Sequence, residues 1–299
     1  MKAQRFWVQR LLTAVATLWA LSVLVFLLTR LSGDPAALLI PPDATGEELQ
    51  HLRAQLGFDR SLFQQYLIYF GQMLRGNFGL SLRYGTSALE LVINRLPATL
   101  QLAATAAVLG WAGAIFLGLL AGAKPNTLWD RLARFVSLFG QSMPVYWLGI
   151  LFIMALSVNL RWLPSSGRGS VLHMVLPALT LSLNMMGTIT RILRVQIQDI
   201  LNQDYIRSAR AKGLSGQKIL FKHALKNAGI SVMTIMGMQM GTLLGGAVVT
   251  ETVFAWPGLG RLLVQAIQFR DFPLVQAGVM VLAAAVIFMN LLTDVLYPM

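Results

Sequence analysis

The chain has 299 residues, of which 56% are hydrophobic and 12% are charged, and its mean hydropathy is +0.64. Soluble globular domains are about 45–50% apolar, so this composition excludes an ordinary soluble protein. The sequence contains no cysteine, which excludes disulfide bonds, thiolate metal sites and a cysteine nucleophile.

The hydrophobic residues gather in runs that are long enough to cross a membrane. Five runs contain no Asp, Glu, Lys or Arg, and a sixth contains only His173 and Pro177 as residues awkward for a span. Because about 20 helical residues cross a hydrocarbon core of about 30 Å, each run can form a span. We therefore predict an all-α polytopic membrane protein with six transmembrane helices, at about 11–29, 97–123, 135–160, 171–190, 227–250 and 272–293.

The first apolar run predicts a retained span and not a cleavable signal peptide. Lys2, Arg5 and Arg10 precede it, as basic residues also precede a signal. A signal peptide has a shorter apolar region of about 7–15 residues, followed by small residues at the cleavage site. Here the uncharged run ends in "TRLSGDP", without an A-x-A pattern.

The net charge of +12 comes mostly from basic residues in the segments that are predicted to lie on the inner side of the membrane. With the N-terminus inside, the inner segments hold 14 of the 24 Lys and Arg residues, and the short outer loops hold four. Basic residues collect in short cytoplasmic loops, whereas long loops escape this rule. The charge therefore predicts cytoplasmic N- and C-termini and gives no reason to expect a nucleic-acid partner. The inner segments are 1–10, 124–134 and 191–226, and the short outer loops are 161–170 and 251–273.

The long outer loop, residues 31–95, is predicted to contain two amphipathic helices. The first opens with a capping box from Thr45 to Glu48 and ends before Gly57. The second, "SLFQQYLIYFGQMLRG", has apolar residues at helical spacing and is closed by Gly76. Helices of this kind lie along the membrane surface or pack on the spans.

Proline and glycine mark special positions in the predicted spans. Pro97 sits at the mouth of the second span, where proline is tolerated in the first turn. Pro144 and Pro177 fall inside spans and should kink them, because each removes an intrahelical hydrogen bond. The fifth span carries three glycines four residues apart, a stripe that lets helices approach closely: Gly237, Gly241 and Gly245.

A short basic segment, "DYIRSARAKGLSGQKILFKHALKNAG", separates two of the spans. Asp204 can cap a helix that runs to Lys212. Gly213 can supply a turn, and Ser215 can cap a second helix over 216–227. A loop lying on anionic lipid would explain the charge, with each basic residue contributing about 1 kcal/mol. It would not explain the small residues near the turn, which suggest a closely fitting partner: Ala209, Ala211 and Gly213.

This segment resembles the cytoplasmic EAA-type loop of ATP-binding-cassette (ABC) importer permeases. The pattern of that loop is E-A-A, three residues, G, nine residues, and I-x-L-P. Gly213 matches the glycine, residues 207–209 (Arg-Ser-Ala) occupy the E-A-A positions, and Leu225 falls on the leucine of the closing motif. The glutamate is absent, and Lys226 stands where proline is usual.

Segments along nearly the whole chain resemble the dipeptide, oligopeptide and nickel branch of this family. They are "GDPA" (33–36), "LGFDRSLFQQY" (56–66), "GNFGLS" (76–81), "RLPATLQLA" (95–103), "ETVFAWPGLGRLL" (251–263), "RDFPLVQ" (270–276) and "NLLTDVLY" (290–297).

The resemblance implies the type I ABC importer permease fold, with an outside helical loop between spans 1 and 2. Residues 1–30 would form the N-terminal transmembrane helix and 31–95 the periplasmic or extracellular helical loop. Residues 96–299 would form the permease core, with a cytoplasmic coupling loop at 191–226. The protein is then a multi-pass protein of the bacterial cytoplasmic (inner) membrane.

The resemblance also assigns candidate functional residues. In such permeases the short helix before the glycine is a coupling helix that sits in a groove of an ATPase subunit. The residues that it assigns to ATPase coupling are Asp204, Tyr205, Ile206, Arg207, Ser208, Ala209, Arg210, Ala211, Lys212, Gly213 and Leu214. The loop around "FAWPGLG" is expected to face outward, as an outer gate, as a contact for a binding protein, or as a structural turn: Glu251, Phe254, Trp256, Pro257, Gly258 and Gly260.

Polar residues inside the spans are candidates for the translocation pathway. Polar groups are costly there and tend to face a cavity, although interhelical hydrogen bonds are an alternative explanation. The candidates are Gln141, Ser142, Asn184, Gln239, Thr242 and Asn290.

The chain contains no G-x-x-x-x-G-K-[ST] motif, so it does not cradle ATP phosphates. The resemblance implies that two partner ABC ATPase subunits bind ATP and Mg and hydrolyse the ATP, while this chain is a transporter subunit without a cofactor. It also implies a second homologous permease, forming a heterodimer, and an external substrate-binding protein, with membrane lipid around them. The expected cargo is a di- or oligopeptide, and the alternative is nickel or a metal chelate.

Two other classes of protein are disfavoured. A membrane enzyme would need clustered catalytic or metal-binding groups, but His51, His173 and His223 are scattered, and "GQSMP" lacks the second glycine of a nucleophile elbow. We therefore assign no catalytic and no metal-binding residue. A passive channel would need pore-lining rings or a filter loop, and it has no use for an EAA-type loop.

Overall fold

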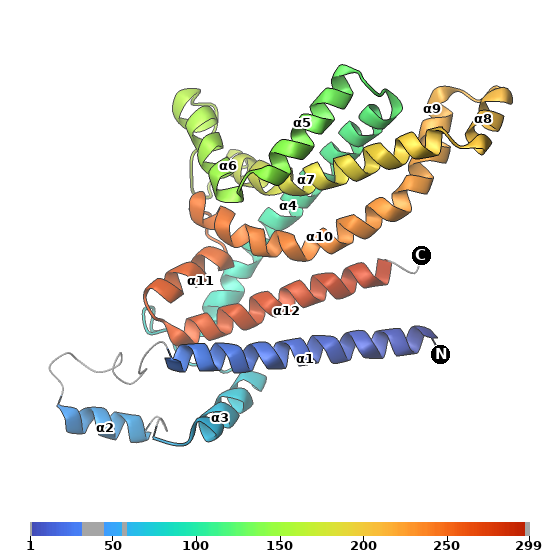
Figure 1. The fold of residues 1–299 in the computed structure, drawn as a ribbon. Coiled ribbons are helices and arrows are strands. Elements are labelled where there is room, and N and C mark those ends of the chain that lie inside the picture. The colour runs from blue at the N-terminus through green and yellow to red at the C-terminus, as the bar shows by residue number, and fades with distance from the viewer. Residues whose placement is uncertain (1, 32–44, 56–58, 297–299) are drawn as a thin grey trace. The chain divides into compact units, whose positions relative to one another are not determined.

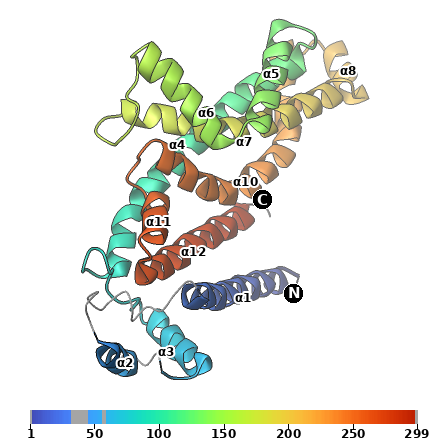
Figure 2. The same ribbon diagram turned by 60° about the vertical axis from the view of Figure 1, so that its left-hand side comes forward.

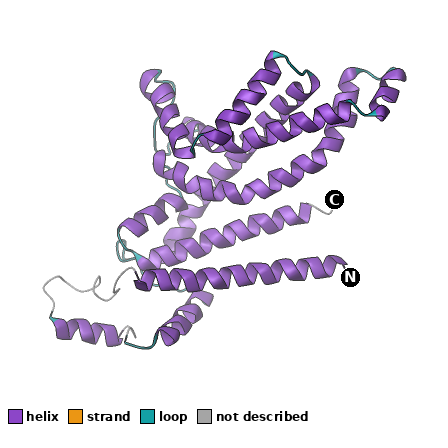
Figure 3. Ribbon diagram, viewed as in Figure 1, coloured by secondary structure: helices purple, strands orange, loops and turns teal. Residues whose placement is uncertain are grey.

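The structure is a computed structural model that describes residues 2–31, 45–55 and 59–296. Its ordered elements in these ranges are helical, apart from an isolated β-bridge between Leu80 and Ser87 (Figures 1 and 3). The elements are α1 (Lys2–Leu31), α2 (Gly46–Gln55), α3 (Leu62–Leu74), α4 (Ala88–Ala123), α5 (Leu128–Ser142), α6 (Val145–Phe152), the π-helical segment η1 (Ile153–Asn159), α7 (Leu172–Leu201), α8 (Asp204–Ala211), α9 (Gly216–Lys218), the π-helical segment η2 (Ile219–Leu225), α10 (Lys226–Val253), α11 (Leu259–Gln268) and α12 (Phe272–Leu296).

Among the described residues, five helices are long and apolar enough to cross a membrane. They are Arg5–Leu31, Ala88–Ala123, Leu172–Leu201, Gly216–Val253 and Phe272–Asp294. A sixth span results if α5 and the helical stretch Val145–Asn159 count as one, although they are bent by 115°. The prediction of an all-α polytopic membrane protein is therefore confirmed.

Proline acts differently at the three positions for which an effect was predicted from the sequence, Pro97, Pro144 and Pro177. At Pro144 the chain bends as predicted, because Met143 and Pro144 are extended between α5 and α6 (ψ 130° and 137°). The helix α7 continues through Pro177, which lies in its second turn, so no break occurs there. The position expected for Pro97 is wrong: α4 begins nine residues earlier, at Ala88, and Pro97 lies in its interior.

The chain forms two compact units. The first, unit 1, comprises residues 1–97 and 262–288. In this unit 1, Phe26 of α1 packs against Tyr66 and Tyr69 of α3, with ring centroids 5.5 and 5.7 Å apart. Gln276 of α12 donates a hydrogen bond of 3.1 Å to the hydroxyl of Thr29 on α1. The three helices α1, α3 and α12 are therefore joined by aromatic and polar contacts.

The two helices predicted in the loop 31–95 are present as α2 and α3, and α3 has the predicted apolar face. The N–H of Thr45 donates to the Glu48 carboxylate at 2.9 Å and the N–H of Glu48 donates to the Thr45 hydroxyl at 3.4 Å, which confirms the capping box. Gly76 has φ +74° just beyond α3, in the left-handed region that favours glycine. The predicted stop at Gly57 lies outside the described residues.

Unit 2 comprises residues 98–261 and 289–299 and has its hydrophobic core around α7. Within this unit, α5, α6 and α10 pack against α7 (Figures 1 and 2). The fully buried core side chains of α7 include Leu176, Ile189, Leu193 and Ile197.

Glycines allow close helix packing at several places in unit 2. On α4, a Cβ at Gly118 would lie 3.0 Å from the side chain of Leu193 on α7. In the predicted stripe on α10, Gly237 faces Thr293 and Gly241 faces Asn290, both on α12, whereas no described residue lies within 4 Å of a Cβ at Gly245. The predicted close approach is confirmed for two of the three stripe positions, and the contact lies within one chain.

Candidate functional site

The basic segment folds as a short helix, a glycine turn and a second helix. Gln203 is the N-cap of α8, so the prediction that Asp204 caps the helix is wrong. Asp204 is the first helical residue, and its negative charge there interacts favourably with the positive end of the helix dipole. Gly213 follows the C-cap with φ +79° and donates its N–H to the carbonyl of Arg210 at 2.9 Å. This left-handed conformation is strained for a residue with a Cβ, which explains the glycine.

The helix after the turn is much longer than predicted. Ser215 is its N-cap as expected, and its hydroxyl accepts a hydrogen bond from the N–H of Lys218 at 3.4 Å. The predicted end at residue 227 is wrong, because α9, η2 and α10 form one helical stretch, Gly216–Val253. No proline interrupts this stretch, and Gly229 alone costs too little helix stability to end it.

A small apolar cluster holds α8 against the helices on either side of it. Ile206, Ala209 and Ile219 are buried there, with exposed fractions of 0%, 8% and 2%, and they pack against Ile200, Leu201 and Leu214. The predicted coupling residues Ile206 and Ala209 therefore stabilise α8 from within the chain. Their side chains cannot supply a contact area for a partner.

The opposite face of α8 is exposed. Tyr205 is 45% exposed, and Ser208 and Ala211 follow it at a spacing of three residues. The remaining exposed residues of the predicted coupling set are Asp204, Arg207, Arg210, Lys212 and Gly213. The face therefore presents one aromatic ring and two small residues among basic side chains, a shape that a partner can approach closely.

A buried carboxylate connects α5 to α7, the helix that precedes α8. The Asp130 side chain is fully buried and accepts hydrogen bonds from the Arg194 guanidinium, from Nη2 of Arg134 at 2.7 Å and from the N–H of Asn126 at 3.0 Å. This cluster was not predicted from the sequence. Its signal was that Asp130 is the only acid in the basic segment 124–134.

The six predicted pathway residues fall into two groups within unit 2. Gln141 and Ser142 lie at the end of α5, close to Asn184 of α7, whose amide donates to the Gly140 carbonyl at 3.2 Å. This interhelical bond gives Asn184 a structural role, while its side chain is exposed, and a role in the pathway stays a prediction.

The second group lies where α10 meets the end of α12. The Thr242 hydroxyl donates to the Gln239 carbonyl at 2.7 Å, and Asn290 lies against Gly241, where a Cβ would be 2.8 Å from its Oδ1. The Oε1 of Gln239 is buried and has no hydrogen-bond partner in the part of the chain that the structure describes. A role of Gln239 in the pathway stays a prediction.

The loop around "FAWPGLG" closes on a buried carboxylate. The Glu251 side chain accepts hydrogen bonds from the Thr99 hydroxyl at 2.6 Å and from the N–H of Arg261 at 3.0 Å. The Thr99 hydroxyl also accepts the N–H of Leu259 at 2.8 Å, and the indole of Trp256 donates to the Ala98 carbonyl at 3.0 Å. Neither partner was predicted from the sequence, because 152 residues separate Thr99 from Glu251, and Arg261 contributes a backbone N–H, a group that every residue except proline carries.

Three side chains of the predicted outer-gate set are buried in this loop. Glu251, Phe254 and Trp256 are at most 1% exposed, so their side chains pack inside the chain, and the expected position of the loop on the outer side of the membrane stays a prediction. Gly258 packs on the Glu251 carboxylate, and a Cβ at Gly260 would lie 2.5 Å from the Cα of Val248. These glycines are required for close packing, which favours the structural alternative for the loop. No cluster of three or more His, Cys, Asp or Glu residues that could bind a metal occurs within the described ranges.

Comparison with known proteins identifies the family. Residues 114–299 match the model "Binding-protein-dependent transport system inner membrane component", and residues 3–103 match the model of the corresponding N-terminal region. The chain is 41% identical over 291 residues to the glutathione transport system permease protein GsiC of Escherichia coli (strain K12), covering 97% of this chain and 95% of that protein. It is 40% identical over the same shares to the protein of that name from Shigella flexneri serotype 5b.

Solved structures support the fold. The chain is similar to a chain of the inward-facing MetNI methionine ABC transporter, with a TM-score of 0.55 and 19% identity over 70% of this chain and 95% of that one. A crystal structure of an amino acid ABC transporter gives a TM-score of 0.55 and 15% identity over 70% and 94%. The chain therefore belongs to the family of inner membrane components of binding-protein-dependent transport systems, and it is a permease subunit of a bacterial ABC importer whose partner ATPases handle the ATP.

Proposed function

We propose that this permease forms half of the translocation pathway for di- and oligopeptides that an external substrate-binding protein delivers. The N-terminal region, residues 3–103, matches a model typical of the oligopeptide, dipeptide and nickel branch. Relatives with 40–41% identity bear the name of glutathione permeases, and glutathione is a tripeptide. Both observations support a short peptide as the cargo. The other half of the pathway comes from a second, homologous permease.

The exposed face of α8 supports a role in coupling transport to ATP hydrolysis. This helix is anchored by its own core, Ile206 and Ala209, and it follows directly on α7. α7 is in turn tied to α5 through the Asp130–Arg194 ion pair and through Gly187, where a Cβ would lie 3.1 Å from the Ser137 carbonyl. A partner ATPase that moved α8 would therefore move α7 and α5 with it, because these contacts leave little room for independent motion.

The cargo can be tested with the complete transporter in proteoliposomes. The permease is reconstituted with its partner permease and two ATPases, and the cognate binding protein is added together with a labelled dipeptide, a labelled tripeptide or Ni²⁺, the last with and without a chelator. We expect a peptide to raise ATP hydrolysis and to accumulate in the lumen in an ATP-dependent way. Uptake of nickel or its chelate, with no response to peptides, would assign the transporter to the metal side of the branch.

A further inference from the structure

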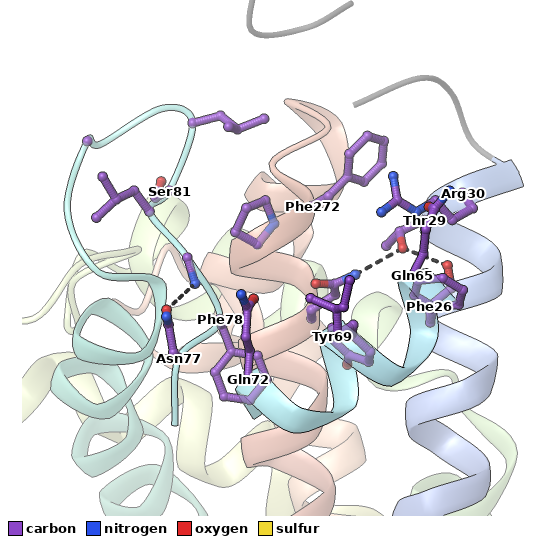
Figure 4. A pocket seen from close by; sticks show the side chains of 17 residues that line it. Phe26, Thr29, Arg30, Gln65, Tyr69, Gln72, Asn77, Phe78, Ser81 and Phe272 are labelled. Carbon is purple, nitrogen blue, oxygen red and sulfur yellow. Dashed lines mark hydrogen bonds between the residues drawn. The ribbon is translucent and has the colours of Figure 1, made fainter. Parts of the chain in front are cut away.

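We propose that unit 1 binds the phosphodiester headgroup of a membrane phospholipid in a cavity between α1, α3, the segment 77–85 and the start of α12. This cavity has a volume of about 640 Å³ and is lined by 17 residues of this unit (Figure 4). Ligand-binding pockets generally measure about 300–1,000 Å³, so the cavity is large enough for a headgroup and its glycerol.

The lining is chemically suited to an amphiphile. Aromatic side chains form its walls, and side chains with amide or hydroxyl groups lie among them (Figure 4). The aromatic residues are Phe26, Tyr69, Phe78 and Phe272, and the polar ones include Thr29, Gln72, Asn77 and Gln276. Among the described residues of the lining, Arg30 is the one that carries a charge, and its guanidinium lies over the Phe26 ring, 5.5 Å from the centroid. A cation beside hydrogen-bond donors favours a phosphate group.

Tyr69 contributes a donor that the protein itself does not use. Its hydroxyl is buried and has no hydrogen-bond partner among the residues that the structure describes. Burial raises the pKa of Tyr69 to about 12, so the hydroxyl keeps its proton at any physiological pH. Buried polar groups are nearly always hydrogen-bonded, and a ligand oxygen in the cavity would satisfy this one.

The position of the cavity along the membrane normal also favours a lipid. Phe26 and Arg30 belong to the last turns of α1, and Phe272 opens α12, so the cavity lies at the ends of two spans. Chain segments at this level meet the lipid headgroups. The proposed lipid site depends only on the location of the protein in a membrane, and it does not depend on which cargo the transporter carries.

The helix α3 has two faces that match the two parts of a phospholipid. Gln65, Ile68, Tyr69 and Gln72 line the cavity. Apolar side chains that are 51–70% exposed lie elsewhere around the helix: Leu62, Phe63, Leu67 and Leu74. An interfacial amphipathic helix places such residues among the acyl chains. A lipid whose head enters the cavity can therefore leave its chains in the bilayer beside α3.

The test compares lipids on the purified, delipidated permease complex in detergent. Native mass spectrometry counts bound lipid, and thermal unfolding reports stabilisation, with phosphatidylglycerol, diacylglycerol and glycerol 3-phosphate as probes. We expect phosphatidylglycerol to bind and to raise the unfolding temperature. Diacylglycerol lacks the phosphate, and glycerol 3-phosphate lacks the chains, so each should bind at least about tenfold more weakly.

Substitutions distinguish lipid binding in this cavity from lipid binding elsewhere on the surface of the permease. Arg30→Gln and Tyr69→Phe each remove one polar group of the lining, and Gln72→Trp fills the cavity from an exposed position. Arg75→Gln is the matched control, because Arg75 is the exposed C-cap of α3 and does not line the cavity. Arg30→Gln and Gln72→Trp should each weaken phosphatidylglycerol binding about tenfold, and the control should bind normally.

Three results would overturn the proposal. Equal lipid retention by the control and by the cavity variants would show that the lipid binds elsewhere on the surface. Binding of diacylglycerol as tight as that of phosphatidylglycerol would show an apolar site that ignores the phosphate. Equally tight binding of glycerol 3-phosphate would show a site for a soluble anion. Because Gln72 is exposed, its variant remains informative if Tyr69→Phe fails to fold.

Discussion

At the scale of single residues, Asp130 and Glu251 are fully buried carboxylates that join segments far apart in the sequence. Burying a charge costs free energy unless hydrogen bonds and opposite charges compensate it. Asp130 has two arginines and a backbone N–H, and Glu251 has the Thr99 hydroxyl and the N–H of Arg261. Each carboxylate therefore fixes the position of the elements that supply its donors.

Replacing Asp130 with asparagine should lower the stability of the permease. The change leaves Arg194 without its buried counter-charge, and hydrogen bonds to charged groups contribute about 1.5–3 kcal/mol. The Arg194 side chain is still 20% exposed and can recover some hydration, so we expect a loss of about 1–3 kcal/mol. Thermal unfolding of the purified protein in detergent measures this loss.

Asp204→Asn is the matched control for Asp130→Asn. Asp204 also pairs with an arginine, Arg207, but both side chains are largely exposed, and such pairs contribute little to stability. The control should unfold at nearly the temperature of the unchanged protein. If the two variants lost the same stability, the buried cluster would not stabilise the contact between α5 and α7.

At the scale of elements, α8 has a buried face that fixes it to its own chain and an exposed face for a partner. Ile206 and Ala209 pack with Ile219, whereas Tyr205, Ser208 and Ala211 face solvent. The two faces alternate at the helical period, so neighbouring residues in the sequence have different roles. A substitution on α8 must therefore be interpreted according to its face.

Ala211→Trp and Ile206→Ala should produce opposite combinations of effects. A tryptophan on the exposed face should leave thermal stability nearly unchanged, because surface substitutions usually shift the free energy of unfolding by less than about 0.5 kcal/mol. It should prevent co-purification of the ATPase subunits by obstructing a close contact. Ile206→Ala leaves a cavity in the small core under α8 and should destabilise the protein by about 2–5 kcal/mol.

Co-purification from detergent-solubilised membranes and thermal unfolding of the isolated permease distinguish the two effects. Normal ATPase binding by Ala211→Trp, together with normal transport, would exclude the exposed face of α8 as the coupling surface.

At the scale of the whole molecule, the distribution of basic residues predicts which ends of the spans are cytoplasmic. The segment 191–226 is rich in lysine and arginine, whereas the loop 31–95 holds six acidic and five basic residues. Because basic residues are retained on the cytoplasmic side, α8 should lie inside and α3 outside.

Cysteine labelling tests this orientation without background, because the natural chain contains no cysteine. Arg75 at the end of α3 and Gln217 in α9 are both exposed, and neither hydroxyl cap, Ser61 or Ser215, is disturbed. In intact cells, Arg75→Cys should react with an impermeant maleimide. Gln217→Cys should react only after the inner side is opened. The reverse result would invert the topology.

The sequence by itself determined the properties that depend on local patterns. The apolar runs predicted the spans, the Thr45–Glu48 spacing predicted the capping box, and Gly213 with Ser215 predicted the turn after α8, all of which the structure confirms. The EAA-type loop and the "FAWPGLG" segment indicated the family of ABC importer permeases. The spans were readable because a helix in hydrocarbon must satisfy its hydrogen bonds within its own segment, and the cap and the turn were readable because their residues lie within a few positions of one another.

Only the tertiary structure decided which side chains are buried and which are paired. The sequence could not show that Ile206 faces inward, because a helix of eight residues gives too few turns to distinguish a core face from a partner face. It gave no partner for Asp130, whose Arg194 lies 64 residues away, or for Glu251, whose Thr99 lies 152 residues away. Such pairs form when packed helices exclude water, so they depend on the arrangement of several elements and not on the pattern of any one of them.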